Sequence, residues 1–322
     1  MNNTDTLQVR VKNITYEATG ILSFELVPLP PSQTLPAFTA GAHIDLHLAN
    51  GLVRSYSLLN NPEQQHRYQI GVNKDANSRG GSRYLHETLH AGAVLTISPP
   101  RNNFPLDERA PHQVFIAGGI GITPMLGMIE RTGALGTPWT LFYSARSRES
   151  SSFLDRVLSF QDRYQGKLVL NFDQESGGQK LNLAAIVKSL PAGAAVYCCG
   201  PLPMLEAFEQ ATASLPPERV HREYFAAKEA AATDGGFTVE LARTGKRMTV
   251  PAGKSILDCL IDMGLEPPFS CREGICGTCE VRVLSGTPDH RDLVLSDTEK
   301  LANDRMMVCC SGAKSASLVL DL

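Results

Sequence analysis

Three cysteines, Cys271, Cys276 and Cys279, stand close together near the C-terminus at C-x4-C-x2-C spacing, and the pair Cys309 and Cys310 follows further along the chain. Three thiolates on one loop and a fourth from a distant segment form the plant-type ligand pattern of a [2Fe–2S] cluster. Such a cluster passes one electron at a time and performs no bond chemistry alone. The spacing therefore predicts an electron-transfer protein whose other parts supply the electrons.

The residues between these cysteines favour a cluster over other uses of cysteine. Gly274 and Gly277 tolerate positive φ, which lets the chain wrap closely around negatively charged sulfurs. A four-cysteine zinc site usually has two short cysteine pairs, whereas here three ligands crowd one loop. Disulfides are not expected, because the N-terminal sequence MNNTDTLQVR has no secretory signal.

Length and composition indicate a globular protein. The 322 residues suffice for two or three domains, each with a core of its own. A net charge of −3 and the lack of any Lys/Arg-rich run argue against nucleic acid as a partner. No run of 18 or more apolar residues occurs, so the sequence predicts no membrane span. We expect a cytoplasmic protein.

The first segment, residues 1–107, is dominated by short β-like runs separated by Gly, Pro or Asn. These runs are 8–14, 21–27, 43–48, 54–58, 68–72 and 94–97. Six short strands at this spacing predict an antiparallel β-barrel. One helix-like stretch, 82–89, interrupts them.

Two pieces of this segment carry residues suited to binding a phosphate and a flat ring. They are Arg54-Ser-Tyr-Ser57 and Gly80-Gly-Ser82, the second leading into the predicted helix. An arginine, together with backbone and hydroxyl donors at a helix N-terminus, forms a phosphate site. Tyr56 could lie against an aromatic ring. Taken singly, each piece is also consistent with an ordinary strand or turn.

The second segment, residues 108–226, alternates strands with helices. A buried-strand run at 113–117 leads directly into Gly118-Gly-Ile-Gly-Ile-Thr-Pro-Met125. Thr123 is a good N-cap and Pro124 suits the first helical position, so we predict a helix from there through Arg131. A glycine turn between a strand and a helix is a pyrophosphate site, although this turn is not the G-x-G-x-x-G fingerprint.

The remainder of this segment repeats the same unit. We predict strands at 140–143, 168–172 and 194–198, and helices at 153–164, 183–189 and 203–211. Repeated β–α units imply a parallel sheet that binds its ligand at the C-terminal strand ends. The turn Cys199-Gly-Pro201 would therefore line the same crevice as the turn after residue 117. This pattern predicts a nucleotide-binding domain.

Residues 227–236 are small and polar and end in glycine, as in an inter-domain linker. The third segment, residues 237–322, begins with a predicted hairpin of 237–241 and 246–250 and a helix at 255–263. The cysteine loop follows. After it we predict a strand that runs through residue 284 and a final strand pair near 307–309 and 317–320.

These segments in this order resemble the phthalate dioxygenase reductase family over essentially the whole chain. The resemblance rests on Arg54–Ser57, Gly80–Ser82, Gly118–Pro124, Cys199–Pro201, Glu223-Tyr-Phe225 and the cysteine set. It implies FMN in a barrel domain (1–107), NADH on an α/β parallel-sheet domain (108–226), a linker (227–236), and a plant-type [2Fe–2S] ferredoxin domain of β-grasp fold (237–322).

The resemblance also implies roles for single residues. FMN would contact Arg54, Ser55, Tyr56, Ser57, Val72, Lys74, Gly80, Gly81 and Ser82, and NADH would contact Gly119, Gly121, Thr123, Pro124, Cys199 and Gly200. Ser57 near the flavin, Cys199 near the nicotinamide, and Phe225, which covers the flavin until nicotinamide displaces it, would form the reaction site. The cluster ligands would be Cys271, Cys276, Cys279 and Cys309.

Two arguments select Cys309 over Cys310. The family ligand lies two residues before a serine, and here that serine is Ser311. Adjacent residues on a strand also point to opposite faces, so only one of the two thiolates should reach the iron.

The implied activity is electron transfer from NADH through FMN and the cluster to the Rieske-type oxygenase component of an aromatic-compound dioxygenase, monooxygenase or demethylase. A flavin is needed because it accepts a hydride and releases electrons singly. A different acceptor, such as a ferredoxin or cytochrome, and a nucleotide-binding redox sensor are the alternatives. Arg146 and Arg148 would suit the 2′-phosphate of NADPH, whereas Asp173 would repel it, so we expect NADH.

Overall fold

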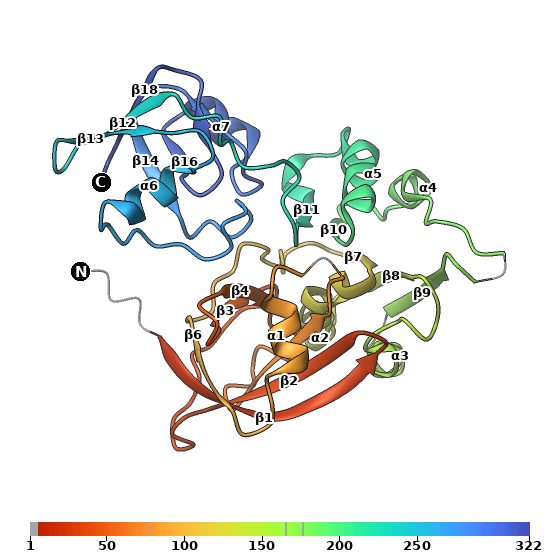
Figure 1. The fold of residues 1–322 in the computed structure, drawn as a ribbon. Helices are drawn as coiled ribbons and strands as arrows, with labels where there is room; N and C mark the ends of the chain where they lie inside the picture. The colour runs from red at the N-terminus through yellow and green to blue at the C-terminus, as the bar shows by residue number, and fades with distance from the viewer. Residues whose placement is uncertain (1–5, 77, 165, 176) are drawn as a thin grey trace. The chain divides into compact units, whose positions relative to one another are not determined.

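The computed structural model describes residues 6–76, 78–164, 166–175 and 177–322. It divides after Glu223 into two compact units (Figure 1). The first unit holds two sheets, each with its own buried core, and the second unit holds a third sheet and core. None of the helices in the described residues is both long and apolar enough to cross a bilayer.

The N-terminal part of the first unit is the predicted antiparallel barrel. Its strands are β1 (Leu7–Ala18), β2 (Ile21–Pro28), β3 (His43–His47), β4 (Val53–Ser57), β5 (Tyr68–Asn73) and β6 (Val94–Ile97), in the order β4-β3-β6-β1-β2-β5. An antiparallel bridge between Leu58 and Ile70 joins the two edges and closes the sheet. The short helix α1 (Gly81–Glu87) follows β5.

The rest of the first unit is a parallel sheet, as predicted, with five strands where four were predicted. Its strands are β7 (Gln113–Gly118), β8 (Trp139–Ala145), β9 (Gly166–Phe172), β10 (Ala195–Cys199) and β11 (Val220–Glu223), in the order β11-β10-β7-β8-β9. The connections are η1 (Gly119–Gly121), α2 (Ile122–Ala134), α3 (Leu154–Arg163), α4 (Leu183–Lys188), α5 (Leu202–Thr212) and η2 (Pro217–Arg219). The strand order reverses between β7 and β10, which is where such sheets bind ligands.

The start of α2 differs from the prediction. A turn of 3-10 helix, η1, precedes it, and Gly121 rather than Thr123 occupies the N-cap position. The Thr123 hydroxyl donates to the carbonyl of Ile120 at 2.9 Å instead of accepting from the helix. The tight glycine turn continues straight into helix, so no extended residue is left to act as a side-chain cap.

Close contacts lock the barrel to the helices that follow it. A Cβ on Gly71 of β5 would lie 2.8 Å from Thr123 Cγ2 and 2.9 Å from Phe153 Cζ. The Arg156 guanidinium donates to the carbonyl of Leu59 at 2.8 Å, which ties α3 to the barrel. Because these contacts are buried or nearly so, the barrel and the parallel sheet form one body.

The second unit is an α+β fold with a mixed sheet. Its strands β12 (Phe237–Leu241), β13 (Lys246–Val250), β14 (Glu280–Ser285), β16 (Arg305–Met307) and β18 (Ser317–Leu320) lie in the order β13-β12-β18-β14-β16, with β12 and β18 parallel. Helices α6 (Ile256–Asp262) and α7 (Asp297–Ala302) and the small pair β15 (Pro288–Asp289) and β17 (Gly312–Ala313) complete it.

Two predictions about this part of the chain were incomplete or wrong. The elements β11, α7, β15 and β17 were not predicted, although Ser296 and Glu299 form a capping box at the start of α7 that the sequence displays. Residues 307–309 do not form a strand that pairs with 317–320. Strand β16 ends at Met307 and pairs with β14, because the chain turns there to present Cys309.

The stretch predicted as a linker lies along the second unit. The Ala232 N–H donates to the carbonyl of Cys310 at 2.7 Å, and the Gly253 N–H donates to that of Thr233 at 2.8 Å. Arg291 forms an ion pair with Glu229 at 2.8 Å. Small residues without bulky side chains allow this close approach, so composition alone does not distinguish a free tether from a packed one.

Candidate functional site

The predicted phosphate-binding pieces lie side by side in the barrel. A Cβ on Gly81 would meet Cγ and Nε of Arg54 at 2.7 Å, so only glycine lets α1 begin against this arginine. Gly80, at φ +100, starts the helix in a conformation that favours glycine. The Ser82 hydroxyl is 3.0 Å from that of Ser78 and accepts the N–H of Asp75 at 3.2 Å. The result is a polar corner with a bare backbone, which fits a phosphate.

The other predicted flavin contacts divide between two faces of the barrel wall. Arg54 and Tyr56 share one face of β4, and burial raises the pKa of the Tyr56 hydroxyl, which keeps it neutral. Ser55 points to the opposite face, where its hydroxyl donates to Asp45 at 2.6 Å. The Val72 side chain is buried in the barrel core, and Lys74 forms an ion pair with Glu87 at 2.8 Å.

Ser57, at the end of β4, brings the barrel to the C-terminal edge of the parallel sheet. Its hydroxyl donates to Oε2 of Glu223 at 3.5 Å, across 166 residues of sequence. Glu223 ends β11 and is directly beside Cys199, the last residue of β10. The three side chains Ser57, Cys199 and Glu223 thus converge. Glu223 belongs to the Glu223-Tyr-Phe225 motif, but no role was predicted for it from the sequence.

Burial keeps this group of side chains neutral. Although Glu223 as a residue retains some contact with solvent, its carboxyl is surrounded by protein, and this raises its pKa to about 8. The hydrogen bond from Ser57 offsets that effect only in part. Burial and the neighbouring carboxylate raise the pKa of the Cys199 thiol well above its ordinary value. At neutral pH the group therefore offers proton donors and no thiolate.

The two glycine turns predicted to bind a nucleotide pack directly on each other. A Cβ on Gly121 would lie 2.2 Å from the carbonyl oxygen of Cys199 and 2.8 Å from the N atom of Gly200. Gly119, at φ +54, faces open space, with no heavy atom within 4 Å of its Cβ position. Thr123 and Pro124, the other two residues predicted to contact NADH, are buried at the start of α2.

The end of β9 bears on the choice between NADH and NADPH. Asp173 follows this strand, and its Oδ1 is buried without a hydrogen-bond partner among the described residues. The Arg148 guanidinium stacks on the Phe172 ring, 5.1 Å from its centroid. The Arg148 N–H donates to Glu175 at 2.6 Å. A carboxylate at such a strand end suits the 2′-hydroxyl of NAD, because its charge would repel a 2′-phosphate.

The four predicted cluster ligands come together in the second unit. The thiol of Cys271 is within hydrogen-bond reach of those of Cys276 and Cys309, and Cys279 is within reach of Cys309. Hydrogen bonds from the Cys271 and Cys279 thiols hold the pKa of Cys309 well below its usual range. All four are buried.

Four thiols are the donor set that a [2Fe–2S] cluster takes. Among the described residues no three His, Cys, Asp or Glu side chains converge tightly enough to hold a single metal ion. A [2Fe–2S] cluster takes four thiolates shared between two irons, so no single ion needs three of them. Gly274 and Gly277, at φ +69 and +75, make the loop conformation that the sequence predicted.

Cys309 and Cys310 occupy a turn and not a strand, so the argument from alternating strand faces was wrong. In this turn the Cys310 N–H donates to the carbonyl of Met307 at 3.3 Å. The Cys310 sulfur lies behind the cluster loop, 2.5 Å from where a Cβ on Gly274 would be.

Phe225, the aromatic residue predicted to cover the flavin, belongs to the second unit, and 39% of its surface is exposed.

Comparison with known proteins relates both units to redox proteins. Residues 239–314 match the 2Fe-2S iron-sulfur cluster binding domain, and residues 115–210 match the oxidoreductase NAD-binding domain. The solved structure of phthalate dioxygenase reductase, described as modular for electron transfer from pyridine nucleotides to [2Fe–2S], is 37% identical with a TM-score of 0.75 and covers 99% of this chain and 98% of its own. This chain belongs to the phthalate dioxygenase reductase family.

Two further relatives match along nearly their whole length. Phenoxybenzoate dioxygenase subunit beta of Ectopseudomonas oleovorans is 54% identical over 98% of this chain and 97% of its own. Tetrachlorobenzoquinone reductase of Sphingobium chlorophenolicum is 48% identical over 100% and 99%. As a phthalate dioxygenase reductase family member, this chain is an NADH-dependent oxidoreductase with FMN and a [2Fe–2S] cluster.

Proposed function

We propose that this chain delivers electrons from NADH to a Rieske-type terminal oxygenase, with the flavin site in the first unit and the cluster in the second. The observation that carries the proposal is the pairing of a neutral polar group, Ser57 with Cys199 and Glu223, and a separate four-cysteine loop. The first suits hydride transfer, and the second suits single-electron exit. Bound FMN supplies the conversion of a hydride into single electrons.

The residues of the chain would bind, orient and protect the FMN and the nicotinamide nucleotide. Arg54 and the backbone of Gly81 would hold the FMN phosphate. The turns at Gly119 and Cys199 would hold the nicotinamide nucleotide against the sheet edge. Glu223 would keep a proton at its carboxyl, and the Ser57 hydroxyl would link that proton to the flavin side of the site.

The acceptor decides between this proposal and a second candidate. The related tetrachlorobenzoquinone reductase suggests a quinone acceptor for this chain instead. We expect NADH-dependent turnover of a purified Rieske oxygenase to require the cluster of this protein, and mass spectrometry of the released flavin to identify FMN. Rapid quinone reduction without oxygenase turnover would favour the second candidate, and release of FAD would contradict the cofactor assignment.

The proposed location is the cytoplasm. None of the eight cysteines forms a disulfide, and a chain that holds its thiols reduced for iron suits a reducing compartment. Cell fractionation that finds the protein in the periplasm would overturn this.

Replacing Asp173 with serine should raise the preference for NADPH over NADH. The carboxylate would otherwise accept the ribose 2′-hydroxyl and repel a 2′-phosphate. We expect the ratio of kcat/KM values to move toward NADPH by about tenfold, corresponding to ~1.4 kcal/mol. Steady-state kinetics with both nucleotides measure it, and Asp162→Ser on α3 is the control. An unchanged ratio would remove Asp173 from the site.

Glu223→Gln should change how stability depends on pH. The unfolded carboxyl titrates near 4.5 and the folded one near 8, so between these values the folded state holds a proton that the unfolded state has released. The free energy of unfolding of the native protein therefore falls as pH rises from 4.5 to 8, because the folded state alone holds this proton in that range. The variant should lose that decline and melt at a higher temperature than the native protein above pH 8.

Thermal melts across this pH range test the prediction, with the exposed Glu218→Gln as control. The same variant should slow flavin reduction by NADH in stopped-flow measurements, because the proton held beside Ser57 is gone. A native pH profile in Glu223→Gln would show that this carboxyl is ionised at neutral pH.

A further inference from the structure

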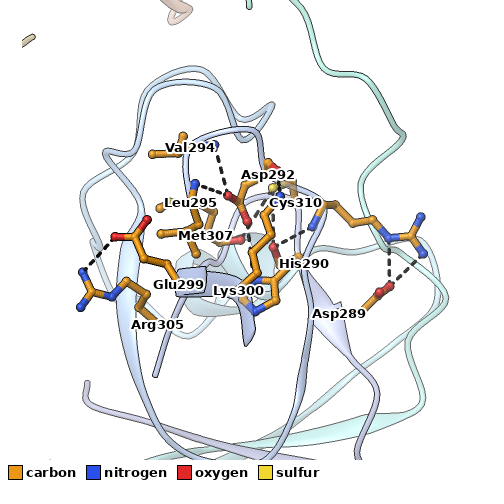
Figure 2. A network of polar contacts seen from close by, with 12 residues as sticks. Asp289, His290, Asp292, Val294, Leu295, Glu299, Lys300, Arg305, Met307 and Cys310 are labelled. Atoms are coloured by element: carbon orange, nitrogen blue, oxygen red, sulfur yellow. Dashed lines mark hydrogen bonds and ion pairs between the residues drawn. The ribbon is translucent and has the colours of Figure 1, made fainter. Parts of the chain in front are cut away.

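A buried histidine and aspartate form an incomplete pair behind the cluster loop. His290 Nδ1 lies 3.6 Å from Asp292 Oδ1, which is too long for a hydrogen bond. The Asp292 side chain is fully buried and that of His290 is 9% exposed. Both ring nitrogens and this carboxyl oxygen lack hydrogen-bond partners among the described residues. Figure 2 shows the surrounding side chains gathered about Asp292.

The other oxygen of the same carboxylate is firmly held. Asp292 Oδ2 accepts the N–H of Leu295 at 2.8 Å and that of Val294 at 3.2 Å. The carboxylate is therefore fixed, with one oxygen directed at the imidazole. An unpaired buried polar atom is destabilising, and a proton on His290 would convert this pair into a charge-assisted contact.

A short chain of hydrogen bonds connects the pair to the cluster ligands. The Gly274 N–H donates to the sulfur of Cys309. The carbonyl of Gly274 accepts the N–H of Leu293 at 2.9 Å, next to Asp292 in sequence. A Cβ on Gly274 would lie 3.0 Å from Asp292 Cα. Only the backbone of the cluster loop separates the His290–Asp292 pair from the cluster ligands. A charge at one of these sites therefore interacts with a charge at the other through a medium of low polarity.

The remaining charged groups around the pair are already partnered. Lys300 Nζ on α7 donates to the backbone carbonyl of Asp292 at 2.6 Å. Arg291 forms ion pairs with Asp289 and Glu229. On the other side lies the thiol of Cys310, whose pKa is raised by the Cys309 thiol, burial and Asp292. Further out, Glu299 caps α7 and Arg305 pairs with Asp304.

His290 is the histidine of the second unit, since no other occurs in residues 224–322. Imidazole is the side chain whose charge ordinarily changes near neutral pH. We propose that His290 takes up a proton when the cluster is reduced, and so makes the reduction potential of the cluster depend on pH. This inference rests on the assignment of Cys271, Cys276, Cys279 and Cys309 as ligands.

The charges balance in this step. One electron arrives on the cluster from the NADH-driven path and adds one negative charge. One proton from water binds His290 and adds one positive charge beside Asp292. When the electron leaves for the acceptor, the proton returns to water. The pair thereby favours reduction at lower pH and release of the electron at higher pH.

Potentiometric titration of the full-length holoprotein, followed by the EPR signal of the reduced cluster, tests the proposal. From about pH 5 to about pH 8, where the charge of histidine ordinarily changes, the native potential should fall as pH rises. If one proton binds for each electron, the potential falls by at most about 59 mV for each tenfold drop in proton activity. His290→Gln should give a potential that is flat with pH, while His66→Gln, at an exposed barrel position, should keep the native slope.

Asp292→Asn provides a second variant, because its amide oxygen can still accept the two N–H groups. It should shift the pH-dependent region to lower pH by removing the carboxylate that favours protonated His290. A flat native profile, or a native slope in His290→Gln, would overturn the inference while the cluster assignment stands. Loss of the EPR signal in the native protein would overturn the ligand assignment itself.

Discussion

Cys309→Ala should abolish the [2Fe–2S] cluster, whereas Cys310→Ala should keep it. The Cys309 sulfur lies within hydrogen-bond reach of the Cys271 and Cys279 thiols and receives the N–H of Gly274. The Cys310 sulfur contacts the Cys309 thiol and lies 3.8 Å from the carbonyl of Met307 and 3.9 Å from the hydroxyl of Ser311. Removing it leaves a small buried space and should cost about 1 kcal/mol of stability.

Iron content, the visible spectrum and the rhombic EPR signal of the reduced protein distinguish the two variants. Both should still bind FMN, which serves as the folding control because the proposed flavin site belongs to the other unit. A cluster that survives Cys309→Ala but is lost in Cys310→Ala would reverse the assignment. Such a result would mean that the turn after Met307 presents the second sulfur.

A chain that stops after Ala226 should keep NADH-dependent flavin reduction and lose electron delivery to the oxygenase. The first unit has its own two cores, so it should fold without the rest. The cut belongs before Glu229, because the stretch predicted as a linker is bonded to the second unit through Glu229, Ala232 and Thr233.

Ferricyanide reduction measures the retained half-reaction, and oxygenase turnover with NADH measures the lost one. Adding the separately expressed residues 227–322 should restore turnover only weakly, because the tether no longer raises the local concentration of the cluster. Normal oxygenase turnover by the truncated chain alone would show that electrons leave directly from the flavin.

Patterns that are local in sequence predicted the fold well. Strand alternation in the barrel, the repeated β–α units and the helix at Ile256–Asp262 all depend on neighbouring residues, and the structure confirms them. Local signals failed where two of them compete over neighbouring residues. Thr123 has the chemistry of an N-cap, yet the turn at Gly119–Gly121 already runs into the helix.

The sequence by itself predicted the cysteine ligands, because three of them lie within one loop whose glycines allow it to wrap around a cluster. It also indicated both glycine turns of the nucleotide site. Only the tertiary structure decided that Glu223 joins Ser57 and Cys199, since a hydrogen bond across 166 residues leaves no local pattern. The same is true of His290 and Asp292, whose place behind Gly274 depends on how the chain folds back onto the cluster loop.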